Sequence, residues 1–160
     1  MQTLLNIVIT FVLMFWPIML MMSPMMFDAP GSQNDKGNIA ILMLVLCYPI
    51  FLFVLLWLFG GRYFGVSGLK FAFISAVVIA IAFSVFGYFG IAFNLYKGIS
   101  NTSYSVADNK VYFNGKPIKD ADSQSFRALD DKQNNFVASD YALDKHYLYC
   151  NGKIVEGATA

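Results

Sequence analysis

Long apolar runs alternate with polar segments through the first hundred residues. The runs extend from about residue 4 to 26, from 39 to 59 and from 71 to 93, and the third contains no charged residue. At about 1.5 Å per residue, each run is long enough as a helix to cross the ~30 Å hydrocarbon core of a bilayer. The pattern predicts a transmembrane domain with three helices over residues 1–97, and a separate polar domain over residues 98–160.

Prolines interrupt two of the runs. Pro17 lacks an N–H and leaves the carbonyl of Leu13 without its helical partner, so we expect a kink there. Pro49 predicts a second kink near the middle of the second run. Ser23-Pro24 is expected to end the regular part of the first helix.

The charges of the short loops predict an orientation. The loop over residues 60–70 contains Arg62 and Lys70 and no acid, whereas the loop over residues 28–38 contains Asp28 and Asp35 against one lysine. The positive-inside rule places the basic loop in the cytoplasm. We therefore expect a bacterial inner-membrane protein with a cytoplasmic N-terminus and a periplasmic tail.

Small side chains recur along the third run. They stand four residues apart, at Ala72, Ala76, Ala80 and Ser84. In lipid, such a ridge allows close approach of another helix. The first or second helix of the same chain is the expected partner, and a homodimer through this ridge is the alternative.

The polar tail contains an internal repeat with an offset of 37 residues. Residues 104–116 align without gaps to residues 141–153, and they share Tyr104/Tyr141, Tyr112/Tyr149, Asn114/Asn151, Gly115/Gly152 and Lys116/Lys153. An Asn-Gly pair between two β-prone segments predicts a hairpin with a type I′ turn. This register pairs Tyr112 with Pro117 and Tyr149 with Ile154. It also places the apolar pairs Val111–Ile118 and Leu148–Val155 on the face opposite those tyrosines, and this apolar face is expected to form the core.

The segment between the hairpins predicts a short helix. Asp122 is a suitable N-cap for a helix that ends near Leu129. A polar loop over residues 130–135 and a strand from Phe136 to Tyr141 are expected to follow. The predicted fold is therefore a membrane α-helical domain joined to a small extracytoplasmic β-rich domain with two Asn-Gly hairpins and a short helix.

The second copy carries a family resemblance. Asp144-Lys145-His146-Tyr147-Leu148-Tyr149, followed by Asn151-Gly152-Lys153-Ile154, resembles the repeat of the DKNYY family. The resemblance covers about residues 104–159; the first copy departs from it by an inserted Asn109, and Thr159 stands where the family has Asp. It implies a bacterial envelope location and a repeat shape, and no established activity.

Candidate chemistry is sparse. The net charge of +1 argues against a nucleic-acid partner. His146 is the only histidine, and Cys47 and Cys150 are expected to lie in different domains. We therefore expect no enzymatic activity, no disulfide and no cofactor. One alternative is a Cu(I) site formed by the thioethers of Met21, Met22, Met25 and Met26, although no His or Cys accompanies them.

The favoured function is protein binding at the membrane by the extracytoplasmic tail. One concrete form is an immunity-type protein that neutralises a toxin acting in the envelope. The alternatives are an accessory subunit of a membrane complex and a methionine-based copper-handling protein. The expected partners are the lipid bilayer and an envelope protein, with the candidate contact residues Tyr104, Tyr112, Tyr141 and Tyr149. Tyr112 and Tyr149 could instead pack on the predicted helix through Phe126 and Leu129.

Overall fold

The computed structural model describes residues 1–29, 31–129 and 140–155. The chain forms two compact units. The first comprises residues 1–28 and 37–88, and the second comprises residues 29–36 and 89–160. The boundary therefore falls inside the third apolar run, between Tyr88 and Phe89.

The first apolar run is helical and is interrupted before its proline. Helix α1 (Gln2–Leu13) ends one turn before Pro17, and α2 (Phe15–Met22) follows after Met14. The 3₁₀ helix η1 (Ser23–Phe27) then begins at the Ser-Pro pair. Both proline predictions for this run are confirmed. The whole segment Gln2–Phe27 is long and apolar enough to cross a membrane.

The second apolar run is a bent helix pair. Helices α3 (Lys36–Leu46) and α4 (Tyr48–Leu58) meet at an angle of 49° around Cys47. The kink predicted from Pro49 is confirmed. Ile50, the regular helical partner of the Leu46 carbonyl, donates its N–H to the carbonyl of Cys47 at 3.0 Å. The pair has the length and composition of one membrane span only if both halves are counted together.

Two hydrogen bonds join the breaks of these helices. The indole N–H of Trp16 donates to the Leu46 carbonyl at 2.8 Å, and the Tyr48 hydroxyl donates to the Val12 carbonyl at 2.8 Å. Each broken helix thus supplies a side-chain donor to a backbone carbonyl beside the break of the other. Such partners matter most where water is excluded.

The third apolar run is shorter as a helix than its sequence predicts. It is preceded by a small hairpin of β1 (Arg62–Tyr63) and β2 (Val66–Ser67). Helix α5 (Gly68–Val85) ends before Gly87, whose φ of 75° is left-handed, and α6 (Tyr88–Tyr96) follows. The expectation of one continuous helix to residue 93 was wrong, because a left-handed glycine ends an α-helix. By length and composition α5 alone has the properties of a membrane span.

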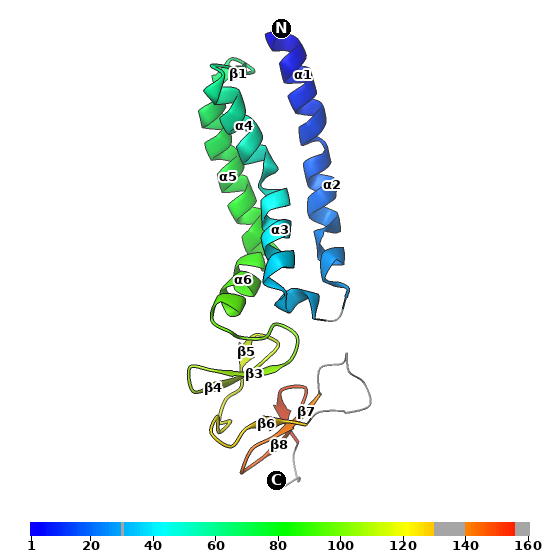
Figure 1. Ribbon diagram of the computed structural model, residues 1–160, viewed down its shortest axis with the longest axis vertical. Coiled ribbons are helices and arrows are strands. Elements are labelled where there is room, and N and C mark those ends of the chain that lie inside the picture. Colours follow the sequence, from blue (N-terminus) through cyan, green and yellow to red (C-terminus); the bar gives the residue numbers. More distant parts are fainter. Residues whose placement is uncertain (30, 130–139, 156–160) are drawn as a thin grey trace. The chain divides into compact units, whose positions relative to one another are not determined.

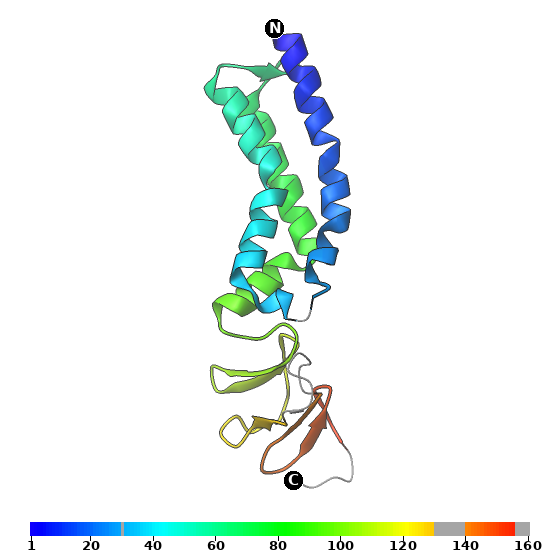
Figure 2. The same ribbon diagram turned by 45° about the vertical axis from the view of Figure 1, so that its right-hand side comes forward.

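Helix α5 packs closely on α4. Figures 1 and 2 both show the two helices side by side in the first unit. Gly68 permits this approach, since a Cβ there would lie 2.8 Å from the Phe53 carbonyl oxygen and from the Trp57 backbone nitrogen. The core at this end consists of Ile9, Phe53, Leu56, Tyr63 and Ala72.

The predicted ridge of small residues is only partly inside the unit. Ala72 is buried and Ala76 is half-buried, whereas Ala80 and Ser84 are exposed. The packed face of α5 instead runs through the buried residues Gly68, Ala72, Ile79 and Phe83. The contact with the second run agrees with the expected intramolecular partner, and the homodimer stays a prediction.

The second unit contains two antiparallel sheets (Figure 1). A short 3₁₀ helix, η2 (Ser32–Asn34), also belongs to it. The first sheet has the order β3-β4-β5, from β3 (Tyr104–Ala107), β4 (Lys110–Phe113) and β5 (Lys116–Pro117). The second has the order β6-β7-β8-β9, from β6 (Arg127–Ala128), β7 (Tyr141–Leu143), β8 (Leu148–Cys150) and β9 (Lys153–Ile154).

The predicted hairpin registers are confirmed. Tyr112 pairs with Pro117, and Tyr149 pairs with Ile154. The next pairs continue the ladders through the hydrogen bonds from Ile118 N–H to the Val111 carbonyl and from Val155 N–H to the Leu148 carbonyl, each at 2.8 Å.

The predicted helix between the hairpins is wrong. Residues 123–125 form a turn, and Arg127–Ala128 is strand β6, which pairs with β7. The Asp122 carboxylate accepts hydrogen bonds from the Gln124 N–H and the Ser125 hydroxyl, at 3.4 and 2.6 Å. An Asp side chain that bonds to the backbone two residues on forms a turn as readily as a helix cap. The predicted polar loop over residues 130–135 and most of the strand from Phe136 lie outside the described residues.

Candidate functional site

Both Asn-Gly turns have the left-handed geometry that the sequence predicts. The φ angles are 49° and 75° at Asn114 and Gly115, and 50° and 74° at Asn151 and Gly152. Positive φ at both central residues defines a type I′ turn. The two hairpins are therefore equivalent in backbone and can be compared face by face.

Each hairpin has two faces, which we name by the strand alternation. The front face of the first hairpin carries Tyr104, Val106, Val111, Phe113, Lys116 and Ile118, of which Val106 and Lys116 are exposed. The equivalent front face of the second carries Tyr141, Leu143, Leu148, Cys150, Lys153 and Val155. The back faces carry Ser105, Tyr112 and Pro117 in the first hairpin, and Ala142, Tyr149 and Ile154 in the second. Successive residues of a strand point to opposite faces, so the assignment follows from the register.

The front face of the first hairpin packs on the back face of the second. Tyr104, Ala142 and Tyr149 form one buried cluster, with Phe113 and Ile118 packed against it. The Phe126 ring lies between the two tyrosines, with centroids 5.5 Å from Tyr104 and 5.8 Å from Tyr149. The two copies of the repeat are thus stacked front to back.

The turn of the second hairpin closes this stack. The Gly152 N–H donates to the Tyr104 hydroxyl at 2.8 Å, and that hydroxyl donates to the Asp140 carbonyl at 3.3 Å. A Cβ on Gly152 would lie 2.7 Å from the Phe113 ring. Glycine is therefore required here for its φ and also for the close approach of the first hairpin.

A buried carboxylate holds the second hairpin together. Asp144 is fully buried and accepts hydrogen bonds from the Tyr149 hydroxyl at 2.7 Å and from the backbone N–H groups of His146, Tyr147 and Asp122 at 2.7, 2.8 and 2.9 Å. Burial raises its pKa, but these four donors outweigh burial and the pKa is lowered. Burial and the hydrogen bond to the Asp144 carboxylate raise the pKa of Tyr149, which therefore stays a donor.

Asp144 also fixes the segment that joins the hairpins. Its Oδ2 accepts a hydrogen bond from the backbone N–H of Asp122. The carboxylate of Asp122 lies 3.3 Å from the Lys145 ammonium. The Lys145 N–H donates to the Ser125 hydroxyl at 3.0 Å. Sequence reasoning treated Asp144 only as part of the family resemblance. A sequence signal for this role exists: in a tight turn, an Asp side chain commonly accepts hydrogen bonds from the backbone N–H groups two and three residues later.

The front face of the second hairpin remains partly open. Tyr141 is 51% exposed, and its equivalent Tyr104 is 9% exposed. Leu143, Leu148, Cys150 and Val155 are each half-buried. The basic side chains Arg127 and Lys153 lie on the same face and are exposed. An apolar centre with a charged rim is typical of a protein-binding surface.

The other end of the stack is covered by the polar segment that precedes it. The Ser100 N–H donates to the Ser105 hydroxyl at 3.0 Å, and Ile99 is buried. A Cβ on Gly115 would lie 2.2 Å from the Asn94 amide nitrogen. Asn94 in turn donates to Asn101 at 2.9 Å. These contacts join the preceding segment to the first hairpin, on whose back face Tyr112 is half-buried and Pro117 is exposed.

The four candidate tyrosines divide into two pairs. Tyr104 and Tyr149 lie in the interior of the stack, in contact with Phe126. The packing alternative named Tyr112 and Tyr149; Tyr149 does contact Phe126, although that residue lies in no helix. Tyr112 is half-buried on the back face of the first hairpin, and Tyr141 is exposed on the front face of the second. His146 is exposed, with its ring 6.0 Å from that of Tyr147.

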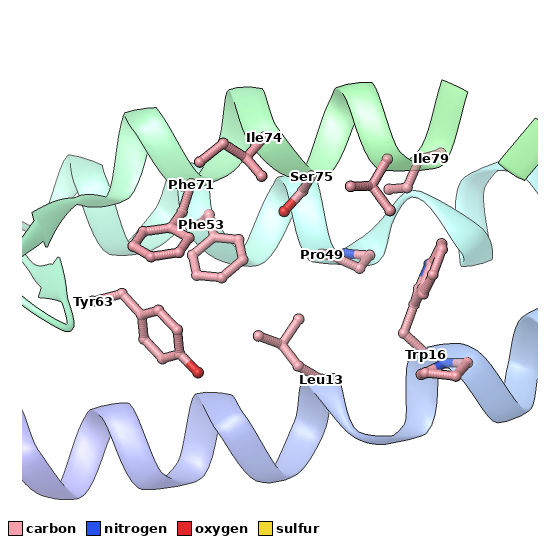
Figure 3. Close-up of a pocket in the computed structure, with 11 residues that line it drawn as sticks. Leu13, Trp16, Pro49, Phe53, Tyr63, Phe71, Ile74, Ser75 and Ile79 are labelled. Atoms are coloured by element: carbon pink, nitrogen blue, oxygen red, sulfur yellow. The ribbon is translucent and has the colours of Figure 1, made fainter. Parts of the chain in front are cut away.

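The first unit contains an apolar hollow of about 270 Å³ between its helices. Figure 3 shows Tyr63, Phe53 and Phe71 at one end and Trp16 at the other, with the Ser75 hydroxyl directed toward the space between the helices. The Tyr63 hydroxyl is hydrogen-bonded to Thr10 at 2.6 Å. The residues that line this hollow include no acid, base, histidine or cysteine, so the hollow suits a lipid chain or apolar side chain.

The methionine cluster surrounds a second hollow. Met19, Met22, Met25 and Met26 line it, together with the apolar residues Leu42, Val45 and Leu46. Met21, in contrast, is largely exposed. No group of three or more His, Cys, Asp or Glu able to hold a metal occurs within the described part of the chain. Methionine is a common filler of such irregular apolar space, and the copper site stays a prediction.

The comparison with known families identifies the tail. The DKNYY family model matches residues 104–160. The C-terminal region is therefore similar to the DKNYY family. The match begins at Tyr104, the first residue of the stacked hairpins, and the resemblance seen in the sequence is confirmed. No curated protein and no solved structure matches the chain significantly.

Proposed function

We propose that this protein is a three-span membrane protein whose DKNYY domain binds a protein partner outside the cytoplasm, without catalysis. The observation that carries the proposal is the open front face of the second hairpin. The equivalent face of the first hairpin contributes Tyr104, Phe113 and Ile118 to the cluster with the second hairpin, so this type of face is suited to packing against protein.

The exposed surface of the helices supports membrane insertion. Large apolar side chains cover it along α1, α4 and α5, among them Leu4, Ile7, Phe11, Phe51, Leu55, Leu58, Phe73, Ile74, Ile81 and Val85. Exposure of such an area to water would cost about 25 cal/mol per Å², whereas lipid removes that cost. With α3 and α4 counted as one bent span, three crossings place the two ends of the chain on opposite sides of the membrane.

The loop charges support a tail outside the cytoplasm. Arg62 lies in β1 and Lys70 in the first turn of α5, whereas Asp28 and Asp35 lie in the loop between the first and second apolar runs. A phosphatase fused after Ala160 is expected to be active in cells, and a fluorescent protein that matures only in the cytoplasm is expected to stay dark. Fluorescence from the second fusion would contradict the orientation. The Arg62→Glu, Lys70→Glu double variant is the control that should weaken the bias.

Protein binding is tested by co-purification from membranes. The full chain is purified in mild detergent beside a Leu148→Lys variant, which places a charge at the centre of the open face. We expect a stoichiometric companion with the natural chain and its loss with the variant. A secreted toxin as companion supports the immunity-type function, and a resident membrane protein supports an accessory subunit. A companion retained equally by both chains would show that another surface is used.

A further inference from the structure

We infer that the apolar hollow between the helices of the first unit binds a lipid-soluble ring compound that carries a carbonyl group, the chemical class of the membrane quinones. All the residues that line the hollow belong to this unit, so the site is independent of any partner of the tail. It rests on the proposed membrane insertion of the helices. The Ser75 hydroxyl carries the inference, because it points into the hollow and has no hydrogen-bond partner among the described residues.

The Ser75 hydroxyl differs from two comparable hydroxyls of these helices. A Ser or Thr in a helix commonly donates to the carbonyl one turn earlier. Thr10 donates in this way to the Asn6 carbonyl at 2.8 Å, and Ser84 donates to the Ala80 carbonyl at 2.9 Å. Ser75 is half-buried and makes no such bond in the described part of the chain, and Figure 3 shows its oxygen directed into the hollow. A donor left without a partner in an apolar space favours a ligand that brings an acceptor.

Water is a poor occupant of the hollow. A buried water molecule makes about two to four hydrogen bonds to polar groups. The other polar side chains of the lining are already engaged: the Tyr63 hydroxyl is bonded to Thr10 at 2.6 Å. The Trp16 indole N–H donates to the Leu46 carbonyl at 2.8 Å. Since the remaining lining side chains are apolar, the acceptor for Ser75 has to arrive on a molecule that is apolar elsewhere.

The depth of Ser75 argues against the ester groups of membrane glycerolipids as that acceptor. Ser75 lies seven residues after Gly68 and ten residues before Val85, the two ends of α5. At about 1.5 Å per residue it is ~10 Å from the nearer end, well inside the hydrocarbon core that α5 has the length to cross. Ester carbonyls lie at the membrane–water interface, so an acyl chain brings only methylene groups to this depth. A ring carbonyl on an apolar molecule that dissolves in the core provides the acceptor there.

The size and lining of the hollow fit a substituted ring. Its volume is about 270 Å³, whereas an apolar cavity of about 150 Å³ is enough to bind benzene. Trp16 lies at one end and the Phe53 ring toward the other, with Ser75 between them (Figure 3). Aromatic side chains pack favourably on the face or edge of another ring. Ile74 and Val78 also line the hollow and are 51% and 46% exposed, so an apolar tail on the ring has an exit toward lipid.

Quenching of the two native tryptophans tests the inference. The full chain is reconstituted in lipid nanodiscs and titrated with a decyl-substituted benzoquinone, because quinones quench indole fluorescence. Trp57→Phe leaves Trp16, at the hollow, as the only tryptophan. Trp16→Phe leaves the exposed Trp57, which lies outside the lining and reports partitioning of the quinone into the bilayer.

We expect saturable quenching of Trp16 and weaker, linear quenching of Trp57. In the chain that retains Trp16, Ser75→Ala should raise the midpoint of the titration about threefold to tenfold, because one hydrogen bond to the ligand is lost. Ser84→Ala is the matched control on the same helix. Its hydroxyl is bonded to the Ala80 carbonyl, so the midpoint should stay unchanged.

Three results would overturn the inference. Linear quenching of Trp16, like that of Trp57, would show that the hollow holds no quinone. A midpoint unchanged by Ser75→Ala would remove the role of the hydroxyl. Displacement of the quinone by decylbenzene at concentrations near the quinone midpoint would assign binding to apolar contact alone, since decylbenzene keeps the ring and the tail but has no carbonyl.

Brominated phospholipid in the same nanodiscs tests membrane insertion separately. It should quench the exposed Trp57. Absence of that quenching would overturn the membrane arrangement and this inference together. Failure of the quinone titration alone would overturn the inference and leave the membrane arrangement and the binding function of the tail standing.

Discussion

The hydroxyl of Tyr104 accepts a hydrogen bond from the backbone N–H of Gly152 at 2.8 Å, and this bond joins the two repeats of the tail. The two residues are 48 positions apart. The contact lies between the packed faces, at the edge of the buried cluster of Tyr104, Ala142 and Tyr149.

Removal of this hydroxyl is expected to loosen the stack. Tyr104→Phe keeps the ring but leaves the Gly152 N–H without its acceptor, which costs about 1–3 kcal/mol when the group is buried. Hydrogen exchange measured by mass spectrometry on the full chain should show faster exchange at the turn of the second hairpin. Tyr112→Phe removes a hydroxyl on the back face of the first hairpin and should leave that exchange unchanged. Equal effects of the two variants would contradict the stacking of front face on back face.

The buried Asp144 predicts acid sensitivity of the tail. The pKa of Asp144 is lowered in the folded state. Its contribution to folding stability is therefore complete above the unfolded-state pKa of about 3.9, and is lost as the pH falls through the lower folded-state pKa. Protease resistance of the tail is therefore expected to be constant from about pH 7 to 5 and to decline below about pH 4.

Asp144→Asn tests the source of this decline. The neutral amide weakens four hydrogen bonds, so the tail should lose about 2–3 kcal/mol at neutral pH. The decline of protease resistance below about pH 4 should also become much smaller in this variant. Asp108→Asn, at an exposed carboxylate 3.9 Å from Lys97, is the matched control and should behave like the natural chain. An unchanged acid profile in Asp144→Asn would assign the effect to other carboxylates.

Substitution of two left-handed glycines in the second unit can distinguish the cost of backbone strain from the cost of steric crowding. Gly152 has a φ of 74° and would bring a Cβ to 2.7 Å from Phe113, whereas Gly98 has the same φ with nothing within 4 Å. Alanine at either position costs about 1 kcal/mol or more in strain. Gly152→Ala should cost substantially more than Gly98→Ala when proteolysis of the tail is compared. Gly115→Val and Gly152→Val, with a β-branched residue at positive φ, should both expose the tail to protease.

The bond between Trp16 and Leu46 gives a prediction for the helical unit. Trp16→Phe retains an aromatic ring and removes the only side-chain donor that the structure describes for the Leu46 carbonyl. We expect a loss of about 0.6–1.7 kcal/mol, the range for polar contacts between membrane helices. Unfolding of the purified protein in mixed detergent measures it. Trp57→Phe, at a largely exposed indole, should have little effect.

The parts of the fold that were predictable depend on local chemistry. Asn-Gly turns require positive φ, so each turn set its own hairpin register, and prolines without an N–H set the breaks near residues 14 and 47. The helix wrongly predicted after Asp122 also has a local cause, because an Asp carboxylate can cap either a helix or a turn. The break at Gly87 was also missed, although a glycine just past the last helical residues is a common helix end.

The identity of the buried faces could not be read from either copy alone. Both hairpins have the same alternation, so the sequence predicted the same core face, that of Val111 and Leu148, in each. The stack instead buries the front face in the first copy and the back face in the second. That choice depends on the order of the two hairpins in the stack, which is a relationship between segments 37 residues apart.

The paired breaks in the first and second apolar runs have a consequence for biogenesis. Each run carries a carbonyl beside its break that receives a donor from the other run, through Trp16 in one direction and Tyr48 in the other. In the proposed membrane arrangement, the first run entering lipid alone leaves its indole and the carbonyl of Val12 without these partners until the second run arrives. The two segments are therefore expected to leave the translocation channel together, as one helical hairpin, before the third segment is threaded.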